Sequence, residues 1–383
     1  MIVAIDSLPL SGRYAKTGTY VYATNLLKGC LEIGESAIPG IEFHAFATAG
    51  DNWATNGFAS RSLRLHESRI LAQKRLWCWG GMAFSTSLLN PDLVFLPSGH
   101  GSIPRPFGPA VITLLDAMPF RLPSGSVVKP LRLRFLSWIS ARLARRIITI
   151  SDCSKQDLVE IYGLDPANID VTYLGYDKQI YNEIPADPAA SAALLARFGI
   201  RRPFILHHGM VQLRKNVHRL IQAWDRMQGL CKEFDAQLVL AGPLGHGHEE
   251  ILRIRRASAN YEQIVLTGPL PDAELATLIK NASLCVIPSL YEGFCLPMVE
   301  AMACGAPTVA SSNSCIPEIS GGVLEYFDPY SVEEMAWVIR KGLEDSEMRG
   351  RLKRDGLSRA AEFSWERCAR ETLNVFVRTL AHD

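Results

Sequence analysis

The sequence contains no apolar run approaching the roughly 18 uninterrupted residues that a membrane-spanning helix needs, so we expect no such helix. Its nine cysteines are scattered and form no Cys-x-x-Cys pair, which favours reduced thiols over a disulfide framework or a zinc site. Charges nearly cancel, with 40 lysines and arginines against 39 aspartates and glutamates, which argues against a general nucleic-acid binder. Residues 1–6 read as a strand without a basic prefix or cleavage site, so we expect a cytoplasmic protein.

The chain instead has the length and composition of two globular domains. It contains 383 residues, of which 48% are hydrophobic. Short apolar strands alternate with amphipathic helices in both halves, which predicts an α/β fold of two Rossmann-like, doubly wound domains facing each other across a cleft. We place the N-terminal domain at residues 1–180 and the C-terminal domain at 181–364. A last helix, at about 365–383, is expected to pack back on the N-terminal domain.

The predicted elements can be given by residue range. Strands are expected at 2–6, 42–48, 93–96, 110–116, 146–150, 204–208, 237–241, 263–267, 281–288 and 307–311. Helices are expected at 19–29, 73–89, 130–144, 154–162, 216–227, 272–282, 297–304, 331–344 and 364–380. The Pro/Ala-rich stretch 182–191 is interpreted as part of the linker between the domains.

The most informative motif is a pair of glutamates, Glu292 and Glu300, that follows the apolar strand 281–288. Pro297 suits the first turn of a short helix and Gly305 suits its C-terminal end, so Glu292 lies on a loop and Glu300 on the helix. In an open α/β sheet this is the edge where ligands bind. The backbone N–H groups of Gly293, Phe294, Cys295 and Leu296 are then close to a positive helix end. This arrangement predicts a site for a polyhydroxylated ligand that carries phosphate.

A second motif supplies positive charge. Arg214 and Lys215 follow the strand 204–208 and Gly209, and they open a helix whose polar cap is Asn216. A solvated surface pair is the alternative interpretation of two adjacent cations. Their position at the ligand edge of a sheet favours binding of a phosphate group.

Two further segments contain glycines that suit loops. Gly18 is predicted to let backbone N–H groups approach a phosphate, whereas Gly12 reads as part of an ordinary flexible loop. The segment 242–247 lacks the G-x-G-x-x-G order of a dinucleotide loop, and the nearby histidines His246 and His248 lack a third metal ligand. We interpret that segment as a loop at the ligand edge, and we expect no metal site.

Taken together, these motifs resemble one enzyme family along nearly the whole chain. The run from Glu292 to Glu300 is similar to the E-x7-E motif of the retaining, GT-B-fold glycosyltransferases of family 4 (group 1). Other matching segments are IDSLPL at 5–10, GTY at 18–20, ITIS at 148–151, TYLGYD at 172–177, HGM at 208–210 and RKN at 214–216. Within the family, the opening and residues 116–119 resemble bacterial mannosyltransferases of surface-polysaccharide synthesis.

The resemblance implies roles for individual residues. Arg214 and Lys215 would bind the diphosphate of a nucleoside-diphosphate sugar, and Glu300 would hold the ribose hydroxyls. Glu292 would contact hydroxyls of the transferred sugar and support charge near the anomeric carbon. Gly18 and Gly209 would approach the donor through their backbone.

One departure from the family pattern concerns the end of the strand 110–116. Many members have His-Asp there, whereas this chain has Leu115 followed by Asp116. Leucine cannot hydrogen-bond a sugar, so either another group such as His100 supplies the contact or the enzyme works without it. We assign Asp116 to the catalytic residues and keep His100 as a speculative candidate, since a histidine flanked by glycines is commonly a plain surface residue.

The N-terminal half also contains a basic and aromatic segment. No acidic residue occurs from 117 to 151, and Phe135 and Trp138 lie among seven basic residues: Arg121, Lys129, Arg132, Arg134, Arg142, Arg145 and Arg146. One interpretation is a helix with an ordinary basic solvent face. The other is a patch that meets anionic lipid headgroups at the inner face of the plasma membrane.

These observations combine into one functional hypothesis. We expect a retaining, metal-independent transfer of a sugar from a nucleoside-diphosphate sugar to a saccharide or lipid-linked saccharide acceptor, in cell-surface polysaccharide synthesis. No cofactor is expected, and GDP-mannose is preferred over UDP-sugars as the donor. The alternatives are a GT-B-fold nucleotide-sugar epimerase and a non-catalytic sugar-nucleotide binding protein.

Overall fold

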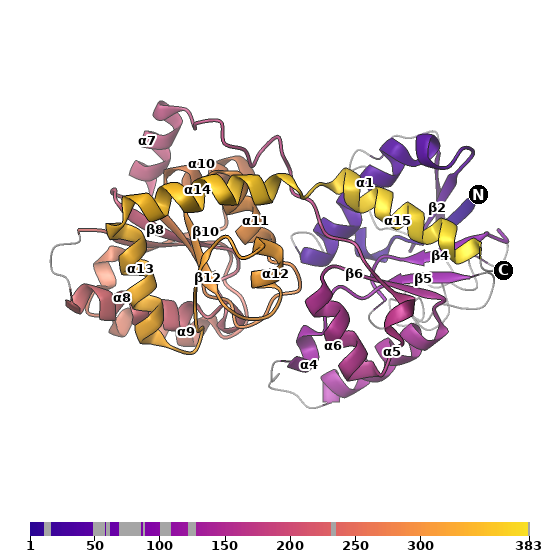
Figure 1. Ribbon diagram of the computed structural model, residues 1–383, viewed down its shortest axis with the longest axis horizontal. Coiled ribbons are helices and arrows are strands. Elements are labelled where there is room, and N and C mark those ends of the chain that lie inside the picture. The colour runs from indigo at the N-terminus through magenta and orange to yellow at the C-terminus, as the bar shows by residue number, and fades with distance from the viewer. Residues whose placement is uncertain are drawn as a thin grey trace. The chain divides into compact units, whose positions relative to one another are not determined.

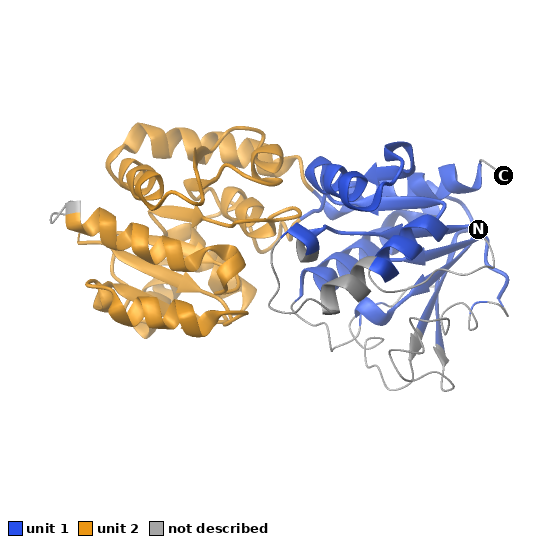
Figure 2. Ribbon diagram, turned by 90° about the horizontal axis from the view of Figure 1, so that it is seen from below, with its two compact units in different colours: residues 1–175, 364–383 blue, residues 176–363 orange. Residues whose placement is uncertain are grey.

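The computed structural model describes residues 1–10, 17–48, 58, 62–68, 86, 89–99, 109–121, 128–230 and 235–381. The chain forms two compact units (Figure 2). Unit 1 comprises Met1–Gly175 and Ser364–Asp383, and unit 2 comprises Tyr176–Phe363. The division therefore falls at Gly175, a few residues before position 180.

Unit 1 is built on a seven-stranded sheet with strand order β3-β2-β1-β4-β5-β6-β7. Every pair in it is parallel. The strands are β1 (Ile2–Asp6), β2 (Glu42–Thr48), β3 (Leu63–Ser68), β4 (Leu93–Leu96), β5 (Ala110–Thr113), β6 (Arg146–Thr149) and β7 (Ile169–Val171). The order reverses direction between β1 and β4, and such a switch point leaves a crevice at the carboxyl ends of the strands.

Unit 2 repeats the same plan with a six-stranded parallel sheet of order β10-β9-β8-β11-β12-β13. Its strands are β8 (Phe204–His208), β9 (Gln237–Ala241), β10 (Ile264–Gly268), β11 (Leu284–Ile287), β12 (Thr308–Ser311) and β13 (Glu325–Phe327). Strands β8, β9, β11 and β12 are buried along their whole length, as expected for a parallel sheet covered on both faces. Here the switch point lies between β8 and β11.

Helices cover both faces of each sheet (Figure 1). Those of unit 1 are α1 (Gly18–Ala37), α4 (Met118–Arg121), α5 (Val128–Leu143), α6 (Asp152–Tyr162) and α15 (Trp365–Leu380). Those of unit 2 are α7 (Pro188–Arg197), α8 (Val217–Leu230), α9 (His248–Ala257), α10 (Asp272–Asn281), α11 (Leu296–Ala303), α12 (Ile316–Ser320), α13 (Val332–Glu344) and α14 (Ser346–Ala361). Side-chain caps begin many of them, including Thr17, Ser151, Asp187, Ser331 and Ser364.

The prediction of two doubly wound parallel α/β domains is confirmed, but several elements differ from it. Helix α1 does not end at Gly29 but continues to Ala37. The glycine permits close packing of α1 on α15, since a Cβ there would lie only 2.9 Å from the Cβ of Ala369. The stretch 182–191 is only partly a linker, since Pro188 begins α7 with Asp187 as its cap. Asn216 directly precedes α8, as predicted, and its carbonyl accepts from the N–H of Leu220, but its backbone is left-handed because it also ends a 3-10 turn (Leu213–Lys215).

Other differences arise from weak periodicity. Strands β3, β7 and β13 were not predicted; all three lie at sheet edges, and β7 and β13 have only three residues each. Helix α14, also not predicted, buries one column of residues four apart: Met348, Leu352, Gly356 and Ala360. Helix α9, which was not predicted, begins at His248, directly after the segment 242–247, and that segment is a loop as expected. Strand β5 ends at Thr113, so Asp116 lies on the following loop. The helix predicted at 73–89 lies almost entirely outside the described residues.

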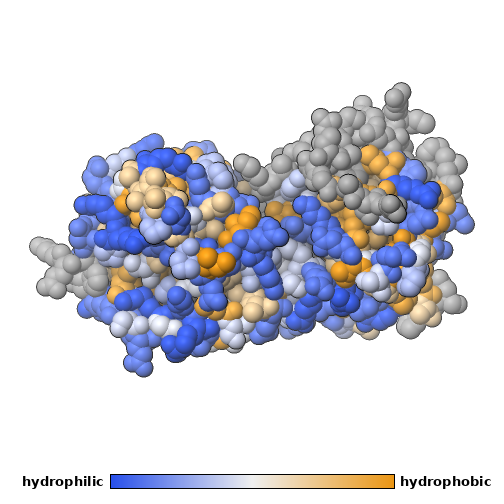
Figure 3. Space-filling model, turned by 90° about the horizontal axis from the view of Figure 1, so that it is seen from above, coloured by the Kyte–Doolittle hydropathy of each residue, from blue (hydrophilic) through white to orange (hydrophobic). Residues whose placement is uncertain are grey.

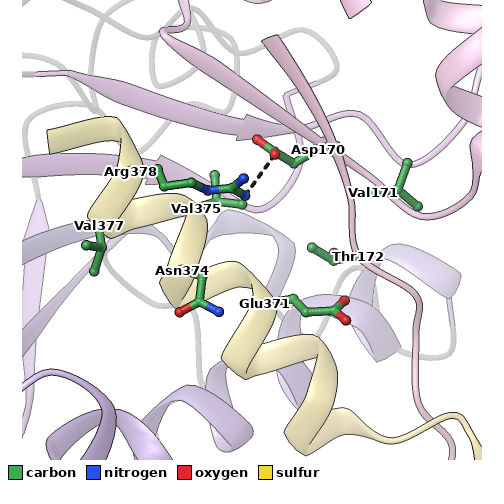
Figure 4. Close-up of a pocket in the computed structure, with 8 residues that line it drawn as sticks. All are labelled: Asp170, Val171, Thr172, Glu371, Asn374, Val375, Val377 and Arg378. Atoms are coloured by element: carbon green, nitrogen blue, oxygen red, sulfur yellow. Dashed lines mark hydrogen bonds and ion pairs between the residues drawn. The ribbon is translucent and has the colours of Figure 1, made fainter. Parts of the chain in front are cut away.

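The last helix, α15, packs against α1 and the sheet of unit 1 (Figure 1). Phe376 meets Phe95 of β4 at a ring-centroid distance of 5.0 Å, and Arg378 donates a hydrogen bond to Asp170 of β7 at 2.9 Å. Arg146 binds the same carboxylate from β6 at 2.7 Å. Figure 4 shows Arg378 and Asp170 at an open groove between β7 and α15. Two guanidinium groups therefore hold the Asp170 carboxylate, and one of them, that of Arg378, ties α15 to the sheet.

Within the described part of the chain, no helix combines the length and the apolar character needed to cross a bilayer. Hydrophobic side chains on the face in Figure 3 form separate patches among hydrophilic ones.

The close approach at Gly175 yields a stability prediction. A Cβ at this position would lie 2.1 Å from the backbone N of Trp365, and backbone atoms cannot move aside as a flexible side chain can. Gly175→Ala should therefore lower the free energy of unfolding by about 2–4 kcal/mol, observed as a lower melting temperature. Gly229→Ala is the matched control, because α8 leaves open space there and alanine should stabilise that helix by up to ~1 kcal/mol. Equal melting temperatures for the two variants would contradict the close packing at Gly175.

Candidate functional site

The predicted ligand-binding residues of unit 2 meet at its switch point. Strand β8 ends at His208 and is followed by Gly209 and the 3-10 turn that carries Arg214 and Lys215. Strand β11 ends at Ile287 and is followed by the loop that carries Glu292. Because β8 and β11 are neighbours in the sheet, two segments about 77 residues apart in sequence share one edge.

The centre of this edge is an ion cluster of one carboxylate and two cations. Lys215 Nζ lies 2.5 Å from Glu292 Oε1, and Arg214 Nη1 lies 3.0 Å from Glu292 Oε2. The side chains of Lys215 and Glu292 are only 9% and 8% exposed, whereas that of Arg214 is 23% exposed. Burial raises the pKa of Glu292, but the charges of Lys215 and Arg214 outweigh it and lower that pKa to about 2. Glu292 is therefore ionised at any physiological pH.

The two loops are also tied together through their backbones. Arg214 Nη1 donates to the carbonyl oxygen of Tyr291 at 2.7 Å, and the N–H of Leu290 donates to the carbonyl oxygen of Arg214 at 2.9 Å. These bonds fix the position of the carboxylate relative to the cations before any ligand arrives.

A third loop, after β12, supports the carboxylate from the other side. Ser314 Oγ accepts from the N–H of Glu292 at 3.1 Å, Asn313 Nδ2 donates to the carbonyl of Leu290 at 2.6 Å, and Ser311 Oγ donates to the carbonyl of Ser289 at 2.7 Å. Sequence reasoning missed these residues. The available signal was the polar run Ser311-Ser312-Asn313-Ser314 directly after a buried strand, at the same sheet edge.

Backbone strain is concentrated at this edge. Among the residues that the structure describes, four non-glycine residues have positive φ, and three lie here: Asn216 (60°), Cys295 (68°) and Ser314 (50°). A left-handed backbone at such residues costs on the order of 1 kcal/mol or more, and it persists where surrounding contacts determine it. Cys295 in this conformation directs the chain into α11, and Asn216 does so into α8. Strain of this kind is typical of functional sites.

The glycines of the segment 242–247 brace the loop that carries the cations. A Cβ at Gly242 would lie 2.0 Å from the carbonyl oxygen of Gly209, and one at Gly247 would lie 2.4 Å from Leu213. Backbone hydrogen bonds run from Gly209 N to Ala241 O (2.9 Å), Val211 N to Pro243 O (2.8 Å) and Gly245 N to Val211 O (2.9 Å). These contacts extend the pairing of β8 with β9 beyond the strands, so the segment positions the cationic loop.

The second glutamate, Glu300, lies one turn into α11 in a different electrostatic setting. Burial of its carboxylate and the nearby negative charge of Asp272 raise its pKa to about 7, against the opposing effect of Lys215. Its side chain keeps 19% exposure, and His208 Nε2 lies 3.9 Å from Oε2. Burial lowers the pKa of His208 to about 3, and the neutral ring lies with Nε2 2.9 Å from the carbonyl of Pro297. The two glutamates thus differ in ionisation, one permanently charged and one close to its titration point.

The remaining predicted residues of unit 2 form the turn into α11. Gly293, Phe294 and Cys295 are buried, Leu296 is half-buried, and Pro297 lies in the first turn of the helix as predicted. Phe294 packs edge-on against Phe363 with ring centroids 5.3 Å apart. The turn is therefore held by packing as well as by strain.

Two predicted residues belong to unit 1. Gly18 is the first residue of α1, directly after the cap Thr17, with open space around the position of a Cβ. Asp116 lies half-buried on the loop after β5, and the carbonyl of Leu115 accepts from Thr149 Oγ1 at 3.4 Å. His100 lies outside the described residues. The roles of these residues stay predictions.

Chemically, the unit 2 edge combines permanent positive charge, one titratable carboxylate and backbone groups at the start of a helix. Such a set binds an anion through charge-assisted hydrogen bonds and binds hydroxyl groups through Glu300. In the described part of the chain, no three His, Cys, Asp or Glu side chains are grouped as a metal site would require.

Comparison with known proteins gives a consistent result. The family described as glycosyl transferases group 1 matches residues 197–359, which contain the ion cluster and both glutamates. The chain is 27% identical to O-antigen chain mannosyltransferase B of Escherichia coli over 343 residues, covering 88% of this chain and 87% of that protein. It is 34% identical over 192 residues to the serotype-specific mannosyltransferase WbdA of E. coli, covering 49% of this chain but only 23% of that longer protein.

Among solved structures, HepE of Anabaena in complex with UDP matches 98% of this chain and 99% of its own, with a TM-score of 0.73 and 17% identity. At this identity the likeness shows the fold alone. It confirms the predicted GT-B class of two Rossmann-like domains.

The contrast between the two glutamates can be measured directly. A titration followed by carboxyl-carbon NMR should show Glu300 changing charge near pH 7, while Glu292 stays ionised down to about pH 4. Asp272→Asn should lower the pKa of Glu300 because it removes a like charge from its surroundings. A Glu300 resonance that titrates at the ordinary glutamate pKa, in both proteins, would show that burial and Asp272 do not act on it.

Proposed function

We propose that this chain, in which residues 197–359 match the glycosyl transferases group 1 family, is a glycosyltransferase that transfers mannose from GDP-mannose to a saccharide acceptor. The choice of sugar rests on the names of two relatives, both mannosyltransferases, one of which matches most of the chain. The O-antigen chain named for one relative suggests a cell-surface polysaccharide as the product. The carrying observation is the pair of cations, Lys215 buried and Arg214 half-buried, beside two glutamates at the switch point of unit 2.

In the proposed reaction, the bond between the anomeric carbon and the phosphate oxygen breaks, and its electron pair passes to the diphosphate. The acceptor hydroxyl oxygen bonds to the same face of the anomeric carbon and gives up its proton to the departing phosphate, so configuration is retained. Negative charge grows on the diphosphate as the bond breaks. Arg214, Lys215 and the N–H groups that begin α11 would stabilise it, which is electrostatic catalysis by preorganised groups.

Each further residue of the cluster has a proposed task. Glu300, ionised above about pH 7, would accept hydrogen bonds from the ribose hydroxyls. Glu292 would face hydroxyls of the transferred sugar, while Gly209 lets the backbone approach the phosphates with its φ of 118°. Asp116 and Gly18 of unit 1 are proposed as further donor contacts. Leu115 leaves the usual histidine contact unfilled, and His100 stays a candidate for it.

The alternatives are distinguished by the acceptor. An epimerase would convert the donor sugar without any acceptor, and a sugar-nucleotide sensor would bind the donor without turnover. The glycosyltransferase consumes the donor and releases nucleoside diphosphate in proportion to the glycosylated acceptor formed. Accumulation of an epimerised donor in an acceptor-free reaction would favour the epimerase.

The exposed face of α5 supports a proposed site for the membrane surface. Phe135 is 59% exposed, Trp138 38% and Leu143 44%, and the rings of Phe135 and Trp138 are stacked at 6.4 Å. The guanidinium of Arg142 lies 5.2 Å from the Trp138 ring. Residues 135, 138 and 142 share one face of the helix, which combines apolar groups with positive charge. We propose that this face binds anionic headgroups and brings the enzyme to a lipid-linked acceptor.

The cation pair should be essential for transfer. Lys215→Met should lower the melting temperature, because the buried Glu292 carboxylate loses one of its two cations. In the folded variant kcat/KM should fall by about 100-fold or more, because the leaving diphosphate loses a preorganised cation. Transfer by the wild-type enzyme should persist in excess EDTA, since the proposal assigns the charge on the diphosphate to Arg214 and Lys215. Near-normal turnover of the Lys215 variant would refute its assignment, and loss of activity restored by a divalent cation would refute metal independence.

Membrane binding should depend on α5. The protein should float with vesicles that contain phosphatidylglycerol and not with phosphatidylcholine vesicles, and salt should release it. Trp138→Ser should reduce the bound fraction several-fold. Trp337→Ser is the matched control, because Trp337 of α13 is 60% exposed with Lys341 5.5 Å from its ring, but it stands among mixed charges. Equal flotation of the two variants, or none for wild type, would exclude this surface.

A further inference from the structure

The carboxylate of Glu292 already occupies the cations that a diphosphate would need. Both of its oxygens are engaged, Oε1 by Lys215 at 2.5 Å and Oε2 by Arg214 at 3.0 Å. Lys215 is 7% exposed, so its ammonium group is withdrawn from solvent and directed at the carboxylate. In this arrangement the ammonium group of Lys215 is paired with Glu292 and is not exposed to solvent.

The charges of the cluster explain why a diphosphate can compete. Two cations against one carboxylate leave an excess of one positive charge, enough to attract an anion but less than the two cations would provide alone. A diphosphate carries more negative charge than Glu292, and it offers several oxygens to the three N–H donors of an ammonium group. When the diphosphate binds, its negative charge lies close to that of the Glu292 carboxylate, and this repulsion weakens its binding.

The surroundings allow the carboxylate to stay while the cation shifts. The backbone of Glu292 is fixed by Ser314 at 3.1 Å, and its loop is held by Asn313 and Ser311, so the anion remains in place when its partner turns away. Lys215 lies on a short 3-10 turn and has a long unbranched side chain, which can move its ammonium group without moving the backbone.

We propose that Glu292 acts as an internal counter-ion for Lys215 and Arg214. The donor diphosphate replaces the carboxylate as the partner of these cations, and after transfer Glu292 recaptures Lys215, which speeds release of the nucleoside diphosphate product. This inference rests on the proposed function and adds a second role to the one that the family resemblance assigns to Glu292. The recaptured pair is the state that the structure shows. Glu292 thereby weakens the binding of donor and product alike, and turnover gains because the product does not remain on an uncompensated pair of cations.

The variant Glu292→Gln tests this role, because the amide keeps the shape and an acceptor for Lys215 but removes the charge. GDP and UDP should bind it about tenfold more tightly than wild type, and the gain should lie mainly in a slower dissociation rate measured by stopped flow. Glu292→Asp keeps the charge and should leave the dissociation rate within about threefold of wild type. In the background of Lys215→Met, the same Glu292→Gln change should tighten binding by much less, since the competition acts largely through Lys215.

A measurement on the wild-type protein does not depend on how the variants fold. Bound nucleoside diphosphate should raise the pKa of Glu292, because the carboxylate loses its cations and gains negative neighbours. Its carboxyl-carbon NMR signal should therefore begin to titrate above about pH 4 in the complex while it stays flat in the free protein. A signal unchanged by the nucleotide would overturn the proposal.

The outcomes separate this inference from the function on which it rests. If wild type transfers sugar but Glu292→Gln binds GDP and UDP no more tightly than wild type, the counter-ion role is wrong and the glycosyltransferase assignment of the site stands. If wild type binds neither nucleotide, the donor site itself is misplaced and both proposals fail. The role is supported if Glu292→Gln binds the nucleotides more tightly and releases them more slowly than wild type, while Glu292→Asp releases them at nearly the wild-type rate.

Discussion

The arrangement of unit 2 depends on one buried ion cluster, in which Glu292 from the loop after β11 holds Lys215 and Arg214 from the loop after β8. Loss of either partner should destabilise the folded protein, because removing one member of a buried ion pair leaves an uncompensated charge and costs about 3–5 kcal/mol. The cluster therefore fixes the distance between two segments that the sheet only brings near each other. Both the binding of a diphosphate and its release, as proposed, would act on this same set of charges.

The loops around the cluster show how the protein secures such a site. Ser314 and Asn313 support the carboxylate from the loop after β12, and Gly242 allows the loop after β9 to meet the backbone of Gly209. Three left-handed, non-glycine residues lie among these contacts. Strain of this kind is retained when neighbouring contacts determine the geometry, and it gives a preorganised site that does not need to be rebuilt for each turnover.

Much of this was predictable from local patterns. The buried strands before Arg214 and Glu292 are continuous apolar runs, and Pro297 places the start of α11, so the elements and their ligand-binding edge could be assigned. The prediction of elements failed where apolar periodicity is weak, as in α14 and β3. It also failed where one residue type serves two purposes, since glycine can end a helix or allow two helices to pack closely. Gly29 reads as the end of a helix but lies within α1, because a neighbouring helix needs the space of its missing side chain.

The sequence by itself determined the fold class, the resemblance to a glycosyltransferase family and the residues with charge at the ligand edge, because strand periodicity and motif spacing are local properties of the chain. Tertiary structure decided how those charges are used. Only the adjacency of β8 and β11 shows that Glu292 is paired with Lys215 and Arg214, and only burial and the field of Asp272 separate the ionisation of Glu300 from that of Glu292. A pKa and an ion pair depend on distances between segments far apart in sequence, which no local pattern encodes.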